Sequence, residues 1–143
     1  MSKLNLNKSW NYPDASESTD HIKLKEKYDL FINGEFVKPN SKKYFNTINP
    51  ATDEIIAKIA EANKKDIDLA VKSARIAFKT WSKLKSKERG KYIFRIARMI
   101  QERSKEFAVI ESMDGGKPIR ESRDVDIPLA VNHFFYYAGW ADK

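Results

Sequence analysis

The sequence predicts an α/β chain in which short strands form hairpins first and three helical regions follow. Residues 29–60 are rich in β-branched and aromatic residues and contain Asn-Gly and Asn-Pro turns, as paired strands do. From residue 63 onward, apolar residues recur every three or four positions, which indicates amphipathic helices. The 143 residues, of which 41% are hydrophobic, are enough for one domain with a globular core.

Two hairpins are predicted before the first helix. Asn33-Gly34 is a strong two-residue turn signal because both positions accept a positive φ, so residues 29–37 should form the first hairpin. Residues 44–48 and 54–60 have β-compatible patterns. They should form a second hairpin, joined by a turn at residues 49–53.

The first helix is predicted from Asn63 to Trp81. Asn63 can cap the helix, and Asp66 can return a carboxylate to the backbone N–H of Asn63, which together make a capping box. Trp81 should anchor the end of the helix in the core. One apolar stripe, with small alanines that allow close approach, should pack against a neighbouring element. It consists of Ile67, Ala70, Val71, Ala74, Ala77 and Phe78.

The second helix is predicted from Ser86 to about Met113. Gly90 should weaken its first turns by roughly 1 kcal/mol relative to alanine, because glycine loses the most backbone freedom in a helix. The side expected to be buried consists of Ile93, Ile96, Ala97, Ile100, Phe107 and Ile110.

The third helical region should begin at Pro118, whose fixed φ suits a first helical position. Pro128 cannot donate an N–H, so it should kink this region or begin a new helix with Asp126 as its cap. The apolar stripe of the region consists of Ile127, Ala130, Val131, Phe134 and Ala138.

Gly115 and Gly116 should end the second helix, because glycine enters left-handed backbone space without a steric penalty. Asp114 lies beside this turn and could help to bind a cation. The turn could instead be only a well-capped corner, and this interpretation is favoured because Gly-Gly-Lys-Pro is ordinary turn chemistry.

The composition excludes several classes of chemistry. The absence of cysteine removes disulfides, thiolate metal sites and a cysteine nucleophile, and two histidines are too few for a His-rich metal site. No Gly-x-Gly-x-x-Gly or His-Glu-x-x-His motif occurs, and Gly115-Gly116-Lys117 lacks the other residues of a phosphate loop. The sequence therefore assigns no catalytic residue and no cofactor-binding residue.

The formal net charge of +7 raises nucleic acid as a possible partner. The densest basic segment, residues 79–91, has no recognisable nucleic-acid module beside it, so a solvated helix junction is favoured. No signal peptide and no apolar run of membrane-spanning length is visible. We therefore expect a cytoplasmic protein that binds neither nucleic acid nor membrane, with a mobile polar tail at residues 1–27 before a folded unit at residues 28–143.

Five segments in this order and spacing resemble the aldehyde dehydrogenase superfamily. The family usually has asparagine where this chain has Gly115, which is a small change within a turn. The resemblance covers about Tyr28 to Lys143, and only the opening third or so of a typical member. The segments are Phe31–Phe36, Ile48–Thr52, Asp68–Phe78, Met113–Pro118 and Tyr137–Lys143.

The resemblance implies NAD(P)-dependent oxidation of an aldehyde to a carboxylic acid, with a cysteine thiolate as nucleophile and a glutamate that activates water. This chain has no cysteine and, by the resemblance, ends before those motifs, so it should be inactive alone. Residues 28–143 would be the incomplete N-terminal part of the cofactor-binding domain. Their partner would be the rest of an aldehyde dehydrogenase chain or subunit, and the complete enzyme would be a homo-oligomer. The alternative is a non-catalytic interaction domain that pairs with a longer aldehyde dehydrogenase subunit.

The resemblance also implies two sites. Some members bind a structural Na⁺ or K⁺ through a backbone carbonyl and an aspartate that correspond to Ile48 and Asp114. Some line the substrate entrance with residues that correspond to Val125 and Leu129, although both could be ordinary packing residues.

Some of the clustered C-terminal aromatics should face water. These are Phe134, Phe135, Tyr136, Tyr137 and Trp140.

Overall fold

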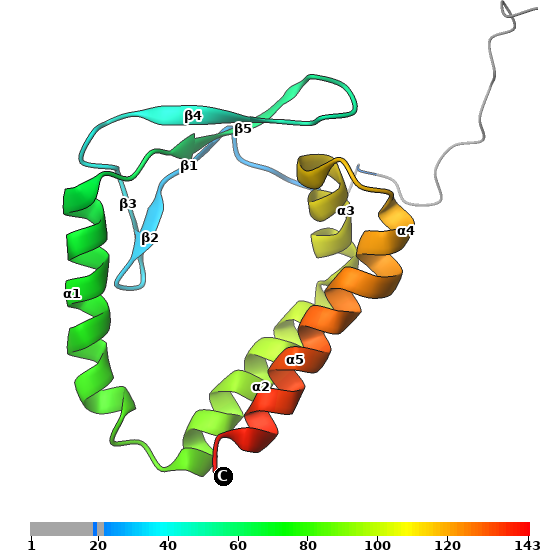
Figure 1. Cartoon of the computed structure of the whole chain (residues 1–143). Helices are drawn as coiled ribbons and strands as arrows, with labels where there is room; N and C mark the ends of the chain where they lie inside the picture. The colour runs from blue at the N-terminus through cyan, green and yellow to red at the C-terminus, as the bar shows by residue number, and fades with distance from the viewer. Residues whose placement is uncertain (1–18, 20–21) are drawn as a thin grey trace, which may run out of the picture.

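The computed structural model describes residue 19 and residues 22–143, and it consists of two small sheets followed by helices (Figure 1). The predicted α/β class is therefore confirmed, with strands first and helices after them. Most of the tail predicted at residues 1–27 lies outside the described residues. The boundary between a mobile tail and a folded unit at residue 28 therefore stays a prediction.

The first predicted hairpin is confirmed as β2 (Leu30–Ile32) paired antiparallel with β3 (Glu35–Val37). Asn33 and Gly34 both have positive φ, 57° and 83°, as the turn type requires. Phe31 and Phe36 face each other across the strands with ring centroids 5.1 Å apart, and both side chains are exposed.

The second predicted hairpin is β4 (Tyr44–Ile48) paired antiparallel with β5 (Ile55–Ala60). A short parallel strand, β1 (Lys27–Tyr28), adds to the other edge of β5 and completes a sheet in the order β1-β5-β4. The register of β4 and β5 shifts between Thr47 and Ile48, at the end of the hairpin that lies nearest the turn.

One hydrogen bond joins the residue after β1 to β4, the strand at the opposite edge of this sheet. The Tyr44 hydroxyl donates to the Asp29 carboxylate at 2.6 Å. This hydrogen bond is the largest of the effects that raise the pKa of Tyr44 to about 12.

Helix α1 (Lys64–Trp81) begins with the predicted capping box. The Asn63 side chain accepts hydrogen bonds from the backbone N–H groups of Lys65 and Asp66, and the Asp66 carboxylate accepts from the N–H of Asn63 at 2.9 Å. The same carboxylate also accepts from the backbone N–H of Asn40 at 3.0 Å. Asp66 is buried and so ties the loop before β4 to the start of the helix.

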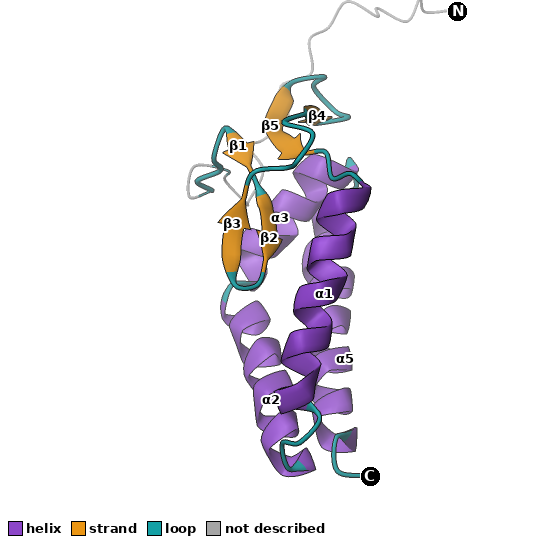
Figure 2. Cartoon of the chain, turned by 90° about the vertical axis from the view of Figure 1, so that its left-hand side faces the viewer, coloured by secondary structure: helices purple, strands orange, loops and turns teal. Residues whose placement is uncertain are grey.

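The apolar stripe of α1 has the predicted spacing, but the described residues of this chain leave much of it exposed. Ile67 is 55% exposed and Phe78 is 63% exposed. The helix lies along the β2–β3 hairpin (Figures 1 and 2), and most of its length is apart from the other helices (Figure 1). Trp81 is not the buried anchor that was predicted, since it is 38% exposed and packs on Tyr92 with ring centroids 5.6 Å apart.

The prediction of a single second helix from Ser86 to Met113 is wrong. This segment is divided into α2 (Ser86–Glu102) and α3 (Ser104–Gly115), with Arg103 between them at φ −105° and ψ 19°. Residues 101–105 are Gln-Glu-Arg-Ser-Lys, so no apolar side chain in this stretch is held in a core that would keep the helix straight. The buried residues lie on either side of the break and include Ala97, Ala108 and Val109.

The third helical region contains α4 (Ile119–Glu121), a π-helical turn (Ser122–Asp126) and α5 (Ile127–Trp140). The new helix predicted near Pro128 is confirmed. Asp126 is not its cap, because Asp126 has helical dihedral angles and makes no capping hydrogen bond. Its carboxylate binds the Lys117 ammonium instead. Pro118 occupies the cap position of α4 rather than the first helical position.

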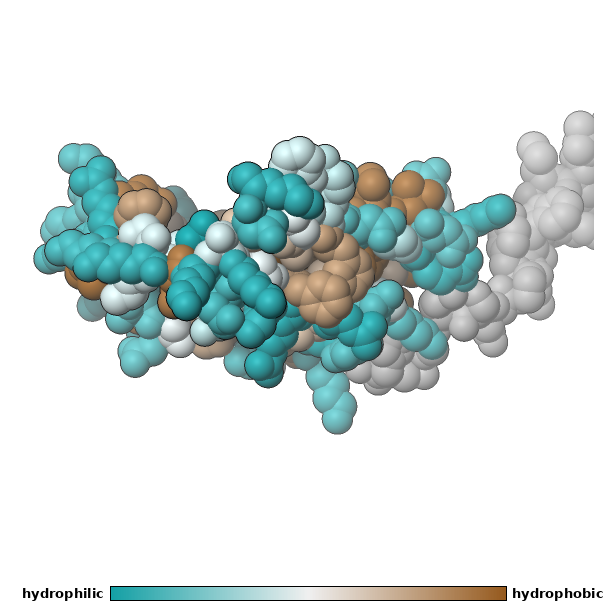
Figure 3. All heavy atoms as spheres, turned by 90° about the horizontal axis from the view of Figure 1, so that it is seen from below, coloured by the Kyte–Doolittle hydropathy of each residue, from teal (hydrophilic) through white to brown (hydrophobic). Residues whose placement is uncertain are grey.

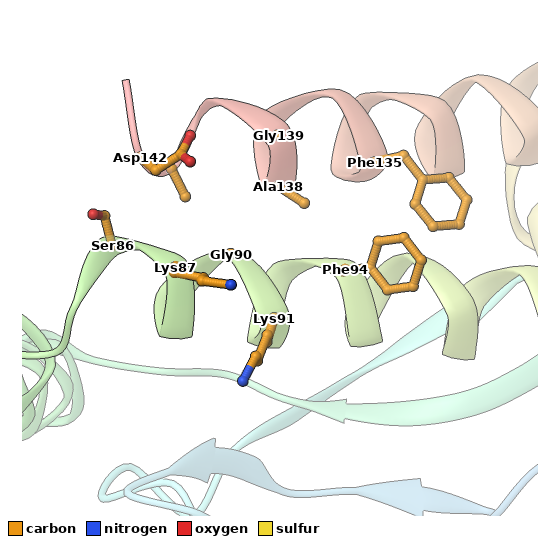
Figure 4. Close-up of a pocket in the computed structure, with 10 residues that line it drawn as sticks. Ser86, Lys87, Gly90, Lys91, Phe94, Phe135, Ala138, Gly139 and Asp142 are labelled. Carbon is orange, nitrogen blue, oxygen red and sulfur yellow. The ribbon is translucent and has the colours of Figure 1, made fainter.

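Helices α2 and α5 pack side by side along most of their lengths (Figure 1). A Cβ added to Gly90 would lie 2.9 Å from the backbone carbonyl oxygen of Ala138, so only glycine permits this approach. Figure 4 shows Phe94 and Phe135 facing each other further along the pair, with ring centroids 5.0 Å apart. Gly90 was predicted only to weaken the first turns of this helix. In the structure it also allows the two helices to pack closely.

We expect Gly90→Ala to lower the free energy of unfolding by about 1–2 kcal/mol, because the overpacking cost exceeds the gain in helix propensity. Gly139→Ala is the matched control, since nothing lies within 4 Å of a Cβ at that position. It should raise stability by up to about 1 kcal/mol. Urea unfolding followed by circular dichroism measures both, and an equal effect of the two variants would contradict the assigned contact.

We expect Asp66→Ala to destabilise the protein by about 1–3 kcal/mol, because it removes a buried carboxylate that accepts from the N–H groups of both Asn63 and Asn40. Asp68→Ala removes an exposed carboxylate from the same helix and should change stability by less than about 0.5 kcal/mol. Thermal unfolding compares the two variants. A loss in Asp66→Ala no larger than that in Asp68→Ala would show that the double role of Asp66 is wrong.

Candidate functional site

Two turns that are far apart in the sequence meet at the end of the β4–β5 hairpin. The Thr47 hydroxyl donates a hydrogen bond to the Asp114 carboxylate, across 67 positions of sequence. Gly116 ends α3 in the left-handed conformation, with φ 67°, as the sequence predicts. A Cβ at Gly116 would lie 3.0 Å from the Pro50 ring, so glycine is needed there for space as well as for conformation.

This corner brings the two residues of the expected cation site onto neighbouring elements. Ile48 is the last residue of β4 and directly follows Thr47, whose side chain binds Asp114. Asp114 itself is exposed, so its carboxylate is accessible to an ion. Within residue 19 and residues 22–143, no three histidine or acidic side chains gather to hold a metal ion, so carboxylates of this region alone do not form a metal centre.

A largely apolar hollow of about 530 Å³ lies beside the same corner. It is bounded by one face of the sheet, by Ile110 of α3 and, at one side, by the Asp114 carboxylate. The side chains from the strands are Tyr28, Phe45, Thr47, Ile56, Ala57 and Ile59. Such a surface is suited to packing against apolar side chains, with Asp114 as its one acidic group.

Val125 and Leu129, the expected entrance residues, lie close together along the third helical region. Val125 is in the π-helical turn and Leu129 is in the first turn of α5. They are 55% and 50% exposed, so neither is a packing residue within the described part of this chain. The alternative interpretation as ordinary core positions would require another segment to cover them.

The π-helical turn that carries Val125 is held by side chains from before the Pro118 corner. Lys117 Nζ lies 2.5 Å from Asp126 Oδ2 and 3.8 Å from Glu111 Oε1. The Asp126 carboxylate is the main cause that raises the pKa of the Lys117 ammonium above its ordinary value. The Ser112 hydroxyl donates to the Ser122 hydroxyl at 3.1 Å, and Ser122 is fully buried.

Sequence reasoning missed this network. Lys117 and Asp126 are nine positions apart with a proline corner between them, and only the turn geometry brings them into contact. The one available signal was a lysine beside a predicted turn with several acids shortly after it, which is common on protein surfaces.

A hollow of about 490 Å³ lies between α2 and α5 (Figure 4). Its lining includes the small residues Gly90, Ala138 and Gly139, and a Cβ added to Gly139 would have nothing within 4 Å. Lys87, Lys91 and Asp142 lie at its edge, so it is a groove between packed helices with charged residues at its rim.

The basic segment at residues 79–91 contains charges that already have partners in the fold. Lys91 pairs with Glu88 at 2.8 Å, and the Arg89 guanidinium donates to the backbone carbonyl of Leu84 at 2.6 Å. Arg89 therefore stabilises the junction between α1 and α2. In the described part of the chain, no helix combines the length and apolar character that crossing a membrane requires.

Comparison with known proteins matches the chain to one family. The Aldehyde dehydrogenase family matches residues 36–143. The mitochondrial aldehyde dehydrogenase family 2 member B4 of Arabidopsis thaliana is 45% identical over 116 residues, which are 80% of this chain and 22% of that protein. The chain spans about a quarter of the length of the curated relatives that it matches.

Solved structures agree with the sequence comparison. The crystal structure of a putative aldehyde dehydrogenase from Burkholderia cenocepacia superposes with a TM-score of 0.80 at 39% identity, and covers 82% of this chain and 24% of that one. The NAD+ complex of an aldehyde dehydrogenase from Bacillus cereus gives a TM-score of 0.78 at 42% identity, with coverage of 83% and 26%. With a family match over residues 36–143 and the same fold in these solved structures, this chain belongs to the aldehyde dehydrogenase family.

Proposed function

We propose that this chain forms the N-terminal part of an NAD(P)-dependent aldehyde dehydrogenase that oxidises an aldehyde to a carboxylic acid. The observation that carries the proposal is the family match over residues 36–143, with about a quarter of the relatives' length covered. The Bacillus cereus relative is seen with NAD+, which supports a nicotinamide cofactor for the complete enzyme.

Exposed apolar surface supports the proposal that further protein packs against this chain. The stripe of α1 is exposed, and so are Tyr136, Tyr137 and Trp140 at the end of α5. Figure 3 shows hydrophobic side chains gathered at the surface between hydrophilic ones. Exposed apolar area of this extent marks a contact with other protein, so we propose that the rest of the enzyme packs on these faces.

These residues by themselves should not catalyse the reaction. Attack on an aldehyde carbonyl by the family's mechanism needs a thiolate, and the sequence contains no cysteine. When bound, a nicotinamide cofactor supplies the hydride acceptor. The contribution of this chain would be scaffold within the cofactor-binding domain and, through Val125 and Leu129, an apolar rim at the substrate entrance.

A second candidate is a non-catalytic interaction domain that pairs with a longer aldehyde dehydrogenase subunit. The same exposed faces favour it, since they would form the contact between two chains rather than within one. For the complete enzyme we propose a cytoplasmic homo-oligomer. For both candidates we propose that neither nucleic acid nor membrane is a partner.

The intact mass of the native protein from its own cells separates the two candidates. We expect a mass well above 16.6 kDa and NAD- or NADP-dependent oxidation of at least one aldehyde in a panel of short and long substrates. Native mass spectrometry of the same sample gives the oligomer, and cell fractionation gives the compartment.

A mass near 16.6 kDa with a longer aldehyde dehydrogenase copurifying would favour the interaction domain. A preparation with no partner and no activity on the panel would overturn both candidates.

We also propose that the carbonyl of Ile48 and the carboxylate of Asp114 contribute to a site for Na⁺ or K⁺ in the complete enzyme. Oxygen ligands suit hard cations, and the Thr47–Asp114 hydrogen bond holds the carboxylate beside the end of β4. The melting temperature should therefore be higher in NaCl or KCl than in choline chloride at equal ionic strength, because an ion that binds only the native state stabilises it.

Asp114→Asn should remove this difference between salts, whereas Asp142→Asn, which changes an exposed aspartate near the end of α5, should preserve it. If the native enzyme melts at the same temperature in all three salts, the cation site is wrong.

A further inference from the structure

The third helical region contains a π-helical turn at the point where the expected entrance residues begin. The N–H of Ile127 donates to the carbonyl of Ser122, five positions back, rather than four. Pro128 follows directly, and its ring would clash with the carbonyl four positions before it in a regular α-helix. The wider turn relieves this clash, and such turns are frequent at functional sites.

Two side-chain contacts fix the turn at its two ends. At its start, Ser122 is fully buried and accepts a hydrogen bond from the Ser112 hydroxyl of α3. At its end, the Asp126 carboxylate binds the Lys117 ammonium, which comes from the corner after α3. Both partners lie outside the turn, so the turn is held against α3 and cannot rotate independently of it.

Val125 lies directly before Asp126 in this clamped turn, and Leu129 follows in the first turn of α5. A side chain that is half exposed has few contacts of its own to fix its position. The direction of Val125 is therefore set by the backbone of the turn, and the backbone by its two clamps.

We propose that Lys117 and Asp126 are positioning residues that set which aldehydes enter the complete enzyme. Their ion pair holds the π-helical turn so that Val125 and Leu129 define the width of an apolar entrance, which discriminates aldehydes by chain length. The inference rests on the proposed function, in which these two side chains line the entrance. Lys117 and Asp126 act through the turn and touch no substrate.

The test uses the complete native enzyme with Lys117→Met or Asp126→Asn, assayed with acetaldehyde and hexanal. We expect the KM for hexanal to change about threefold to tenfold, because a displaced apolar contact alters the binding of the longer chain. The kcat for both substrates and the KM for acetaldehyde should remain within about twofold of the original, since the reacting atoms are not touched.

Two control variants separate the ion pair from a general effect of losing a lysine. Lys91→Met breaks the exposed pair with Glu88 on α2 and should leave both substrates unaffected. Lys117→Arg retains a cation for Asp126 and should retain most of the original selectivity. A loss of selectivity in Lys91→Met equal to that in Lys117→Met would overturn the proposal.

Val125→Ala and Leu129→Ala distinguish failure of this inference from failure of the entrance itself. If either variant changes hexanal selectivity while Lys117→Met and Asp126→Asn do not, the positioning role is wrong and the entrance stands. If none of the four changes selectivity, the entrance assignment is wrong and the inference fails with it.

Hydrogen exchange gives a readout that does not depend on catalysis. The amide of Ile127, bonded to the Ser122 carbonyl, should exchange faster in Lys117→Met than in the original protein, while amides at the centre of α2 should be unchanged. Equal protection of Ile127 in both proteins would show that the ion pair does not hold the turn.

Discussion

The contact between two turns joins the strand half of this chain to its helical half. The Thr47 hydroxyl binds the Asp114 carboxylate, and Gly116 lies against the ring of Pro50, so the end of the β4–β5 hairpin rests on the end of α3. Everything after Gly116 takes its direction from this corner. The clamped π-helical turn and α5 are placed by it, and α5 in turn places α2 through the close approach at Gly90.

The exposed apolar faces have a common physical origin. The stripe of α1 has the regular spacing of a buried helix face, yet Ile67 and Phe78 are more than half exposed. Amphipathic spacing specifies that a face is to be buried but not which element buries it. The chain spans about a quarter of its relatives' length, and in the proposed function the rest of the enzyme would supply that cover. The helices therefore carry contact surfaces as well as a fold.

The candidate sites could be predicted from the sequence only in part. Family resemblance pointed to Asp114, Val125 and Leu129, because each lies at a fixed distance from a short motif. The side chains that hold these residues could not be found that way. Asp126 is an acidic residue near a predicted helix start, so a capping role was the reasonable local interpretation. Its carboxylate binds Lys117 instead, because the corner folds the chain back on itself.

The sequence by itself determined the local features: the Asn33-Gly34 turn, the capping box of α1, the stop at Gly116 and the absence of a cysteine nucleophile. Each depends on residues within a few positions or on composition alone, so no distant contact can change it. Tertiary structure decided the need for glycine at position 90 and the partner of Asp126. Gly90 lies against the carbonyl of Ala138 on another helix, and Lys117 reaches Asp126 only because the corner at Pro118 folds the chain back. Neither contact follows from the weak local preferences of a helix, because each depends on how separate elements are placed.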